Sequence, residues 1–181
     1  MLLKLLGERG GGPSLPIDAA VAISVPYDLA AGAAALERGL GPLYAGFFLR
    51  KLKRKVRAKA TILEGACDVP RALAARTLRD FDDAATAPLH GFDGALDYYR
   101  RSSSNQFLRQ VAVPTLLIHS VDDPFLPSHA IPLKAIRDNP ALDASVLPRG
   151  GHVGFVEGPP WAPRYWAEAE AARFLATQLE R

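Results

Sequence analysis

An acidic residue and a histidine each follow an apolar run in the second half of the chain. Asp123 comes after residues 113–119, and His152 comes after residues 144–147, within a Gly-Gly-His sequence. Side chains that follow adjacent parallel strands meet at one edge of a sheet, where α/β proteins place functional groups. There a carboxylate can accept the Nδ1 proton of a histidine, whose Nε2 then takes a proton from a nucleophile. The pair therefore predicts acid–base chemistry.

Each residue of this pair also has a plain structural interpretation. An Asp-Asp-Pro sequence favours a turn for reasons of backbone geometry, and a histidine in a glycine loop can be a surface residue. Together, in this order and after consecutive strands, they favour catalysis and match the second half of the Ser…Asp…His order of α/β-hydrolases. Asp122 is expected to orient the acid loop, and His119 to be a hydrogen-bonded core histidine rather than a base.

A nucleophile for such a triad is missing from the chain. No Gly-x-Ser-x-Gly sequence, the usual nucleophile elbow of the fold, occurs anywhere in it. The remaining candidates lack the elbow glycines, and a structural role is the favoured interpretation of each: Ser14, Ser24, Cys67 and the serines at 102–104.

Apolar patterns predict the elements that would position the acid and the base. Strands are expected over residues 19–25, 113–119 and 144–147, and the first of these has the non-alternating pattern of a buried parallel strand. Helices are expected over residues 1–8, 28–39, 43–59, 70–81, 93–101 and 128–138. In a further, C-terminal helix one face would be formed by Tyr165, Ala169, Ala172, Ala176 and Leu179. The order predicts an α/β fold with a parallel sheet and a helical insertion at about residues 28–110.

The composition is that of a globular protein with one unusual segment. The 181 residues include 49% hydrophobic residues and a single cysteine, which excludes an internal disulfide framework and fits a cytoplasmic location. No apolar run reaches the roughly 18 residues of a membrane-spanning helix. The net charge is +3, yet residues 50–59 carry seven basic residues and no acidic one, so the rest of the chain carries −4.

The basic segment 50–59 has three interpretations. The favoured one is a solvated face on a lid helix, and the second is weak contact with anionic lipid headgroups at a membrane surface. Nucleic-acid binding ranks third and is not expected, because aromatic residues are not interleaved and no recognition motif accompanies the segment.

Several other polar or aromatic residues receive structural interpretations. The acids of the Asp-Phe-Asp-Asp sequence at 80–83 are expected to form a helix-end turn rather than a metal site, because partner ligands are lacking. His90 is expected to be structural or close to a pocket, and Trp161 and Trp166 are expected to be packing residues.

The chain resembles the YheT-like family of α/β-hydrolases. The matching stretches run along nearly the whole chain in family order: residues 1–8 (MLLKLLGE), 25–28 (VPYD), 79–83 (RDFDD), 90–92 (HGF), 97–100 (DYYR), 114–125 (PTLLIHSVDDPF) and 150–155 (GGHVGF). The resemblance implies Asp123 as the catalytic acid and His152 as the catalytic base.

The same resemblance implies the fold, the reaction and a missing part. It implies the C-terminal portion of an α/β-hydrolase fold, one partial domain over residues 1–181 with a helical cap at about 28–110. The family's elbow serine, its oxyanion-hole loop and the first strands of its sheet would lie before Met1. The implied activity is hydrolysis of carboxylic esters, of short to medium acyl chains or of acylglycerol-type lipids, without cofactor or metal.

A second class of function stays open at this point. Without a nucleophile, the chain could be a non-catalytic homologue that acts as a binding protein. The codons upstream of Met1 would distinguish the two, because an in-frame Gly-x-Ser-x-Gly sequence there would favour the enzyme.

Overall fold

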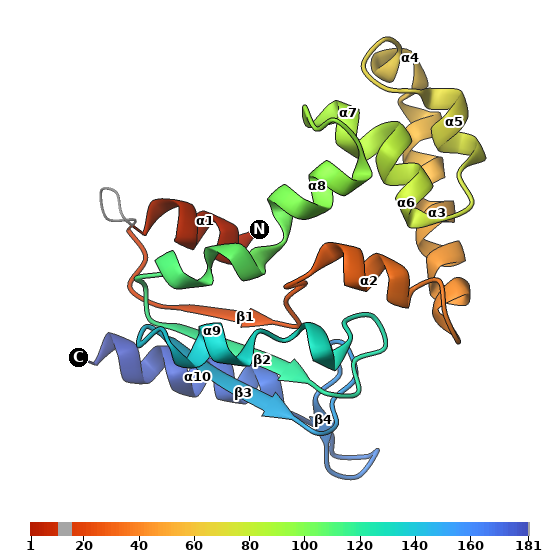
Figure 1. Ribbon diagram of the computed structural model, residues 1–181. Helices are drawn as coiled ribbons and strands as arrows, with labels where there is room; N and C mark the ends of the chain where they lie inside the picture. Colours follow the sequence, from red (N-terminus) through yellow and green to blue (C-terminus); the bar gives the residue numbers. More distant parts are fainter. Residues whose placement is uncertain (11–15, 181) are drawn as a thin grey trace. The chain divides into compact units, whose positions relative to one another are not determined.

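The computed structural model describes residues 1–10 and 16–180, which form two compact units. The first takes in the described parts of residues 1–28 and 103–181, and the second comprises residues 29–102. Ser14, one of the serines considered above as a nucleophile, lies outside the described residues. Figure 1 shows the strands and α10 in the first unit and helices alone in the second.

The first unit is built on a parallel sheet. Its strands are β1 (Ala20–Ile23), β2 (Thr115–Ser120) and β3 (Leu142–Leu147), in the order β1-β2-β3. Both pairings are parallel, with Ile23 opposite Ile118 and Ser120 opposite Leu147. All six residues of the central strand β2 are buried. The predicted α/β class, the parallel sheet and the adjacency of the strands that precede Asp123 and His152 are confirmed.

Side chains of β2 alternate between two apolar cores, one on each face of this sheet. Leu117 packs with Leu3 and Leu6 of α1 (Leu2–Arg9), with Leu108 of η2 (Ser104–Gln110) and with Ile136 of α9 (Leu133–Arg137). Leu116 and Ile118 pack on the other face with Phe155 and with Ala167 and Phe174 of α10 (Trp166–Leu179). A parallel sheet needs such cover on both faces, and helices supply it here.

The face named for the C-terminal helix lies on its exposed side. Tyr165 and Leu179 are 57% and 70% exposed, and Ala169, Ala172 and Ala176 are exposed as well. The buried stripe contains Ala167 and Phe174, with Trp166 and Leu175 partly buried beside them. These larger side chains bury more apolar area than a stripe of alanines, which decides the rotation of the helix.

Proline and short strands explain two further differences in the first unit. The helix expected over 128–138 is divided into a 3-10 turn, η3 (Ser128–Ala130), and α9, because Pro132 cannot donate a helical hydrogen bond. An antiparallel pair, β4 (Val156–Glu157) and β5 (Arg164–Tyr165), was not predicted, because two-residue strands show no readable alternation.

The second unit consists of helices around its own core. They are α2 (Leu29–Ala35), α3 (Gly41–Ala58), α4 (Ala60–Leu63), α5 (Val69–Ala74), α6 (Leu78–Phe81), the π-helical η1 (Asp82–Thr86), α7 (Ala87–Leu89) and α8 (Ala95–Ser102). Leu49 and Val56 of α3 pack with Ala72, Phe81 and Ala84. The resemblance assigns this unit the role of a cap, and that role stays a prediction.

The single helix predicted over 70–81 is wrong, because the chain breaks between α5 and α6. Ala75 has an extended backbone, and Thr77 begins α6 with a capping box. The Asp80 amide donates to Thr77 Oγ1 at 3.0 Å, and the Thr77 amide donates to Asp80 Oδ2 at 3.0 Å. Such reciprocal caps favour a new helix start over continuation of the old helix.

None of the helices in the described parts of the chain is both long enough and apolar enough to cross a lipid bilayer.

Candidate active site

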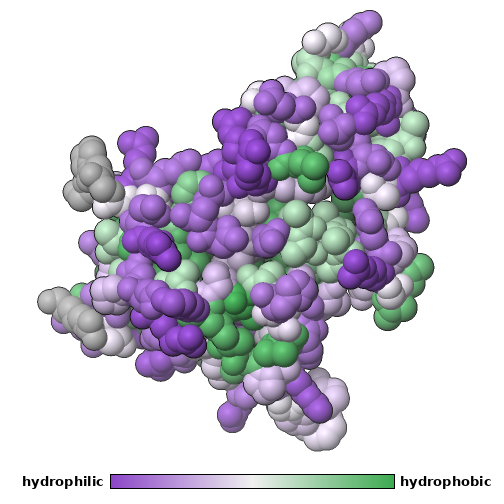
Figure 2. Space-filling view, in the orientation of Figure 1, coloured by the Kyte–Doolittle hydropathy of each residue, from purple (hydrophilic) through white to green (hydrophobic). Residues whose placement is uncertain are grey.

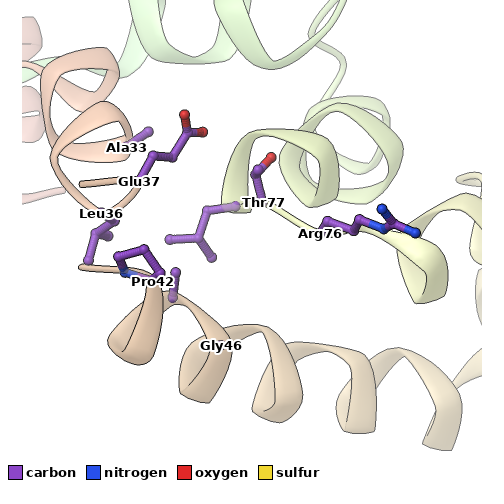
Figure 3. A pocket seen from close by; sticks show the side chains of 9 residues that line it. Ala33, Leu36, Glu37, Pro42, Gly46, Arg76 and Thr77 are labelled. Carbon is purple, nitrogen blue, oxygen red and sulfur yellow. The ribbon is translucent and has the colours of Figure 1, made fainter. Parts of the chain in front are cut away.

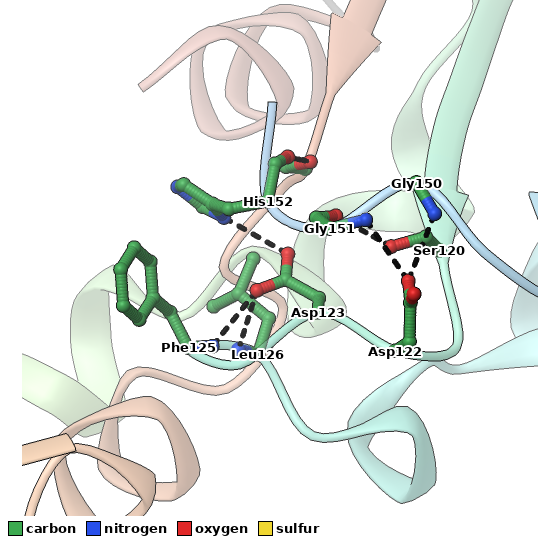
Figure 4. Close-up of polar contacts among 9 residues, drawn as sticks. Ser120, Asp122, Asp123, Phe125, Leu126, Gly150, Gly151 and His152 are labelled. Atoms are coloured by element: carbon green, nitrogen blue, oxygen red, sulfur yellow. Dashed lines mark hydrogen bonds and ion pairs between the residues drawn. The ribbon is translucent and has the colours of Figure 1, made fainter. Parts of the chain in front are cut away.

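Asp123 is held in the turn that follows β2. Its Oδ1 accepts hydrogen bonds from the backbone amides of Phe125 at 2.8 Å and Leu126 at 3.1 Å (Figure 4). The residue is only 7% exposed. These two bonds fix the carboxylate through one oxygen and leave Oδ2 to face the loop that follows β3.

His152 occupies that loop and meets the free oxygen of Asp123. Nδ1 of His152 lies 2.9 Å from Asp123 Oδ2, so the contact predicted from the sequence is present. The Asp123 side chain is fully buried, whereas the His152 side chain is 33% exposed. The edge of the His152 ring packs on Phe125, with 4.8 Å between ring centroids. No described residue hydrogen-bonds to Nε2 of His152.

The backbone of the His152 loop is fixed from two strand ends. Asp122 Oδ1 accepts from the amides of Gly150 and Gly151, both at 2.9 Å, and Ser120 Oγ donates to the Gly151 carbonyl at 2.5 Å (Figure 4). These amide bonds, led by that from Gly151, lower the pKa of Asp122. Asp122, which directly precedes Asp123, thus ties the loop after β2 to the loop that holds His152, and its expected role in orienting the acid loop stays a prediction.

Ser24 has the structural role that its sequence favoured, and its contact with the His152 loop is one that the sequence did not predict. It follows β1, is 5% exposed, and its hydroxyl donates to the backbone carbonyl of His152. Its φ of 51° lies in the left-handed region, which is uncommon for a residue other than glycine. The signal in the sequence is a polar residue at the end of a buried strand, directly before Val25-Pro26.

The other nucleophile candidates that the structure describes do not hydrogen-bond to the His152 ring. Ser104 donates to the Pro26 carbonyl at 3.2 Å. Ser102 ends α8, and Cys67 lies between α4 and α5 in the helical unit. Burial, and to a lesser degree the neighbouring Asp68 carboxylate, raises the pKa of the Cys67 thiol and disfavours the reactive thiolate.

His119 lies in the core as predicted, but it is not hydrogen-bonded as expected. It is 1% exposed, and neither ring nitrogen has a hydrogen-bond partner within the described part of the protein. Its ring lies 5.7 Å from that of Tyr27. Burial lowers the pKa of His119 more than the nearby Asp123 carboxylate raises it, which favours a neutral ring.

The acids at 80–83 make structural contacts within the helical unit. Asp82 accepts from Tyr99 at 2.7 Å and from Thr86 at 2.6 Å, and burial raises its pKa. Asp83 accepts from the Ala95 amide at 3.0 Å and pairs with Arg71 at 2.5 Å, which lowers its pKa. These bonds support a structural role for the acidic sequence, but the expected helix-end turn is wrong, because residues 80–83 lie within α6 and η1.

Two more expectations can be compared with the structure. Trp166 is partly buried against the α10 core, but Trp161 is 85% exposed, so its expected packing role is wrong. His90 is an exposed residue at the end of α7.

A cavity of about 250 Å³ lies within the helical unit (Figure 3). Neither Asp123 nor His152 is among the residues that line it. Leu36, Pro42, Ala45 and Leu78 give it apolar walls, and Glu37 and Arg76 contribute opposite charges.

We expect Gly150→Ala to dislodge the His152 loop. A Cβ at Gly150 would lie 2.6 Å from the Phe155 ring and 3.1 Å from the Ser120 Cβ, and because the Phe155 ring is itself buried, we expect the loop to shift. Nuclear Overhauser contacts between the His152 and Phe125 rings should be lost. Gly46→Ala is the control, because nothing lies within 4 Å of the added atom. Unchanged contacts between the two rings in Gly150→Ala would contradict this expectation and show that the His152 loop keeps its position.

The geometry described so far defines an α/β protein with an Asp–His pair at the carboxyl edge of its sheet. No family model matches the chain. Among curated proteins, it is 37% identical over 182 residues to "Putative esterase YheT" of Escherichia coli (strain K12), covering 99% of this chain and 53% of that protein. It is 35% identical over 159 residues to "Phospholipase ABHD3" of Bos taurus, covering 87% of this chain and 38% of that protein.

A third relative extends the comparison to fungi. The chain is 29% identical over 184 residues to "Monoacylglycerol lipase" of Saccharomyces cerevisiae, covering 97% of this chain and 39% of that protein. The chain thus spans about half or less of the length of these relatives. It belongs to the YheT-like family of α/β-hydrolases, in agreement with the motifs in its sequence.

Proposed function

We propose that Asp123 and His152 are the acid and base of a Ser-His-Asp triad that hydrolyses carboxylic esters. The observation that supports this most directly is the 2.9 Å contact between His152 Nδ1 and the buried Asp123 carboxylate, with the imidazole partly exposed. A surface histidine beside a turn aspartate would not need three separate side chains to fix its loop.

The proposed roles follow from the hydrogen-bond geometry. Asp123 holds the proton on Nδ1, so Nε2 is the basic nitrogen and accepts the proton of the serine hydroxyl as its oxygen attacks the ester carbonyl carbon. The imidazolium then donates this proton to the departing alkoxide, and an acyl-enzyme remains. Water repeats the two transfers and releases the acid. In this scheme the serine comes from a polypeptide segment other than the described residues.

Lipid esters are the proposed substrate class. The names of two relatives, a phospholipase and a monoacylglycerol lipase, refer to enzymes that act on acyl esters of glycerol-based lipids. Short to medium acyl chains are the first esters to test, because a p-nitrophenyl leaving group reports their hydrolysis directly.

The test compares two polypeptides on p-nitrophenyl butyrate. We expect negligible turnover by the 181-residue chain, because it holds an acid and a base without an elbow serine. A polypeptide extended by the in-frame upstream codons should hydrolyse the ester, and His152→Ala should remove that activity. Robust turnover by the 181-residue chain that survives His152→Ala would overturn the proposal.

A further inference from the structure

Helix α3 has one buried face and one outward face. Ala45, Leu49 and Val56 are buried, and the last two pack in the core of the helical unit. Residues spaced three or four apart share a helix face, so the opposite side carries Leu43, Phe47, Lys51 and Arg54. All four of these residues are exposed. We call this side the outward face of α3.

The first turns of the outward face expose large apolar side chains. Leu43 is 73% exposed and Phe47 46%, and Leu40, directly before the helix, is 71% exposed. Each such side chain forgoes roughly 1.5–3 kcal/mol of burial while it stays in water. Figure 2 shows apolar residues in green over the end of α3 that follows α2. Clustered exposure of this kind marks an interaction site.

The later turns of the outward face are cationic. Lys51, Arg54 and Lys55 are exposed there, and Arg50, Arg57 and Lys59 flank them. None of these six pairs with a carboxylate among the described residues, and no acidic residue occurs between Glu37 and Glu64. The ammonium group of Lys51 lies 4.3 Å from the centroid of the Phe47 ring, where the apolar and cationic parts meet.

We propose that the outward face of α3 docks on the surface of an anionic lipid bilayer. Leucine and phenylalanine side chains would enter the boundary between headgroups and acyl chains, and the basic side chains would contact lipid phosphates. A bilayer supplies both an apolar layer and a negative surface, matching the two parts of this face. A nucleic acid matches only the cationic part and would leave Leu40 and Leu43 in water.

This proposal does not rest on the proposed hydrolase function, because vesicle binding requires no turnover. The experiment measures co-sedimentation of the full chain with vesicles of phosphatidylcholine containing about one third phosphatidylserine. Pure phosphatidylcholine vesicles serve as the comparison. We expect binding to the anionic vesicles, strong weakening by added salt, and little binding to the neutral ones.

Two variants separate the contributions of charge and apolar insertion. The triple variant K51Q/R54Q/K55Q should lower the vesicle partition coefficient by about 100-fold, since each basic residue near the surface contributes about fivefold. The variant L43S/F47S should also weaken binding while keeping the charge. R109Q/R137Q/R164Q removes the same charge from exposed positions outside the helical unit and should have a much smaller effect.

The proposal is overturned by any of three results. One is equal affinity for neutral and anionic vesicles. Another is an equal loss in the two triple variants, which would show only a net-charge effect. The third is binding of a short single-stranded RNA under salt conditions where anionic vesicles do not bind. Circular dichroism of each variant should show the helix content of the unmodified chain, so that lost binding reports the surface rather than unfolding.

Discussion

Asp123→Asn is expected to reverse the tautomer of His152. The asparagine Oδ1 can still accept from the Phe125 and Leu126 amides, which now bond to Asp123 Oδ1. Its Nδ2 then faces His152 Nδ1 and must donate to it, so the histidine proton moves to Nε2. The ring nitrogen that should act as the base is thereby blocked. Nitrogen-15 shifts of the His152 ring in the 181-residue chain measure this change directly.

The same substitution predicts a large kinetic effect in a polypeptide that hydrolyses esters. Loss of the correct tautomer lowers kcat by about 10⁴-fold in triads of this kind. Asp143→Asn is the matched control, because Asp143 is exposed on β3 and, among the described residues, its carboxylate hydrogen-bonds only to the amide of Ala144 at 2.8 Å. An unchanged tautomer in Asp123→Asn, together with unchanged kcat, would remove Asp123 from the proposed triad.

The contact between Asp123 and His152 could be predicted from the sequence because the position of the two residues follows from topology. Two consecutive strands with polar residues after each can form neighbours in a parallel sheet, and Asp123 and His152 then share an edge. The supporting bonds could not be predicted in the same way. Ser24 comes from a strand 128 positions before His152, and its role depends on a backbone carbonyl, to which no residue pattern points.

The differences between the expected and the observed helices have two physical causes, local hydrogen bonding and tertiary burial. The break between α5 and α6 and the split at Pro132 are decided by local hydrogen bonds, Thr77 with Asp80 in one case and a missing donor in the other. The rotation of α10 is decided by tertiary burial of Phe174 rather than by the periodicity of its alanines. Sequence patterns determine where elements form more reliably than where they end or which side they bury.

Asn139→Ala is expected to destabilise the sheet unit by about 3 kcal/mol. Asn139 is 8% exposed and lies after α9, where its Nδ2 donates to the carbonyls of Leu108 at 2.7 Å and Val111 at 2.8 Å. Its Oδ1 accepts from the Ala141 amide at 2.9 Å. Alanine removes all three of these bonds, each worth about 1 kcal/mol, although the Leu108 carbonyl keeps a bond from the Val111 amide at 3.3 Å. The loss is a large part of a typical stability of about 5–15 kcal/mol.

Thermal unfolding of the full chain measures this effect, with an expected decrease in Tm of about 6–12 °C. Asn139→Asp keeps the acceptor for the Ala141 amide but removes both donors and adds a charge, so it should destabilise at least as much at neutral pH. Asn105→Ala is the control, since Asn105 is exposed and its side chain carries no comparable bonds in the described structure. Its effect should stay within about 0.5 kcal/mol. If Asn139→Ala unfolds at the same temperature as the control, water replaces the amide without cost, and the link between η2 and the turn before β3 does not stabilise the sheet unit.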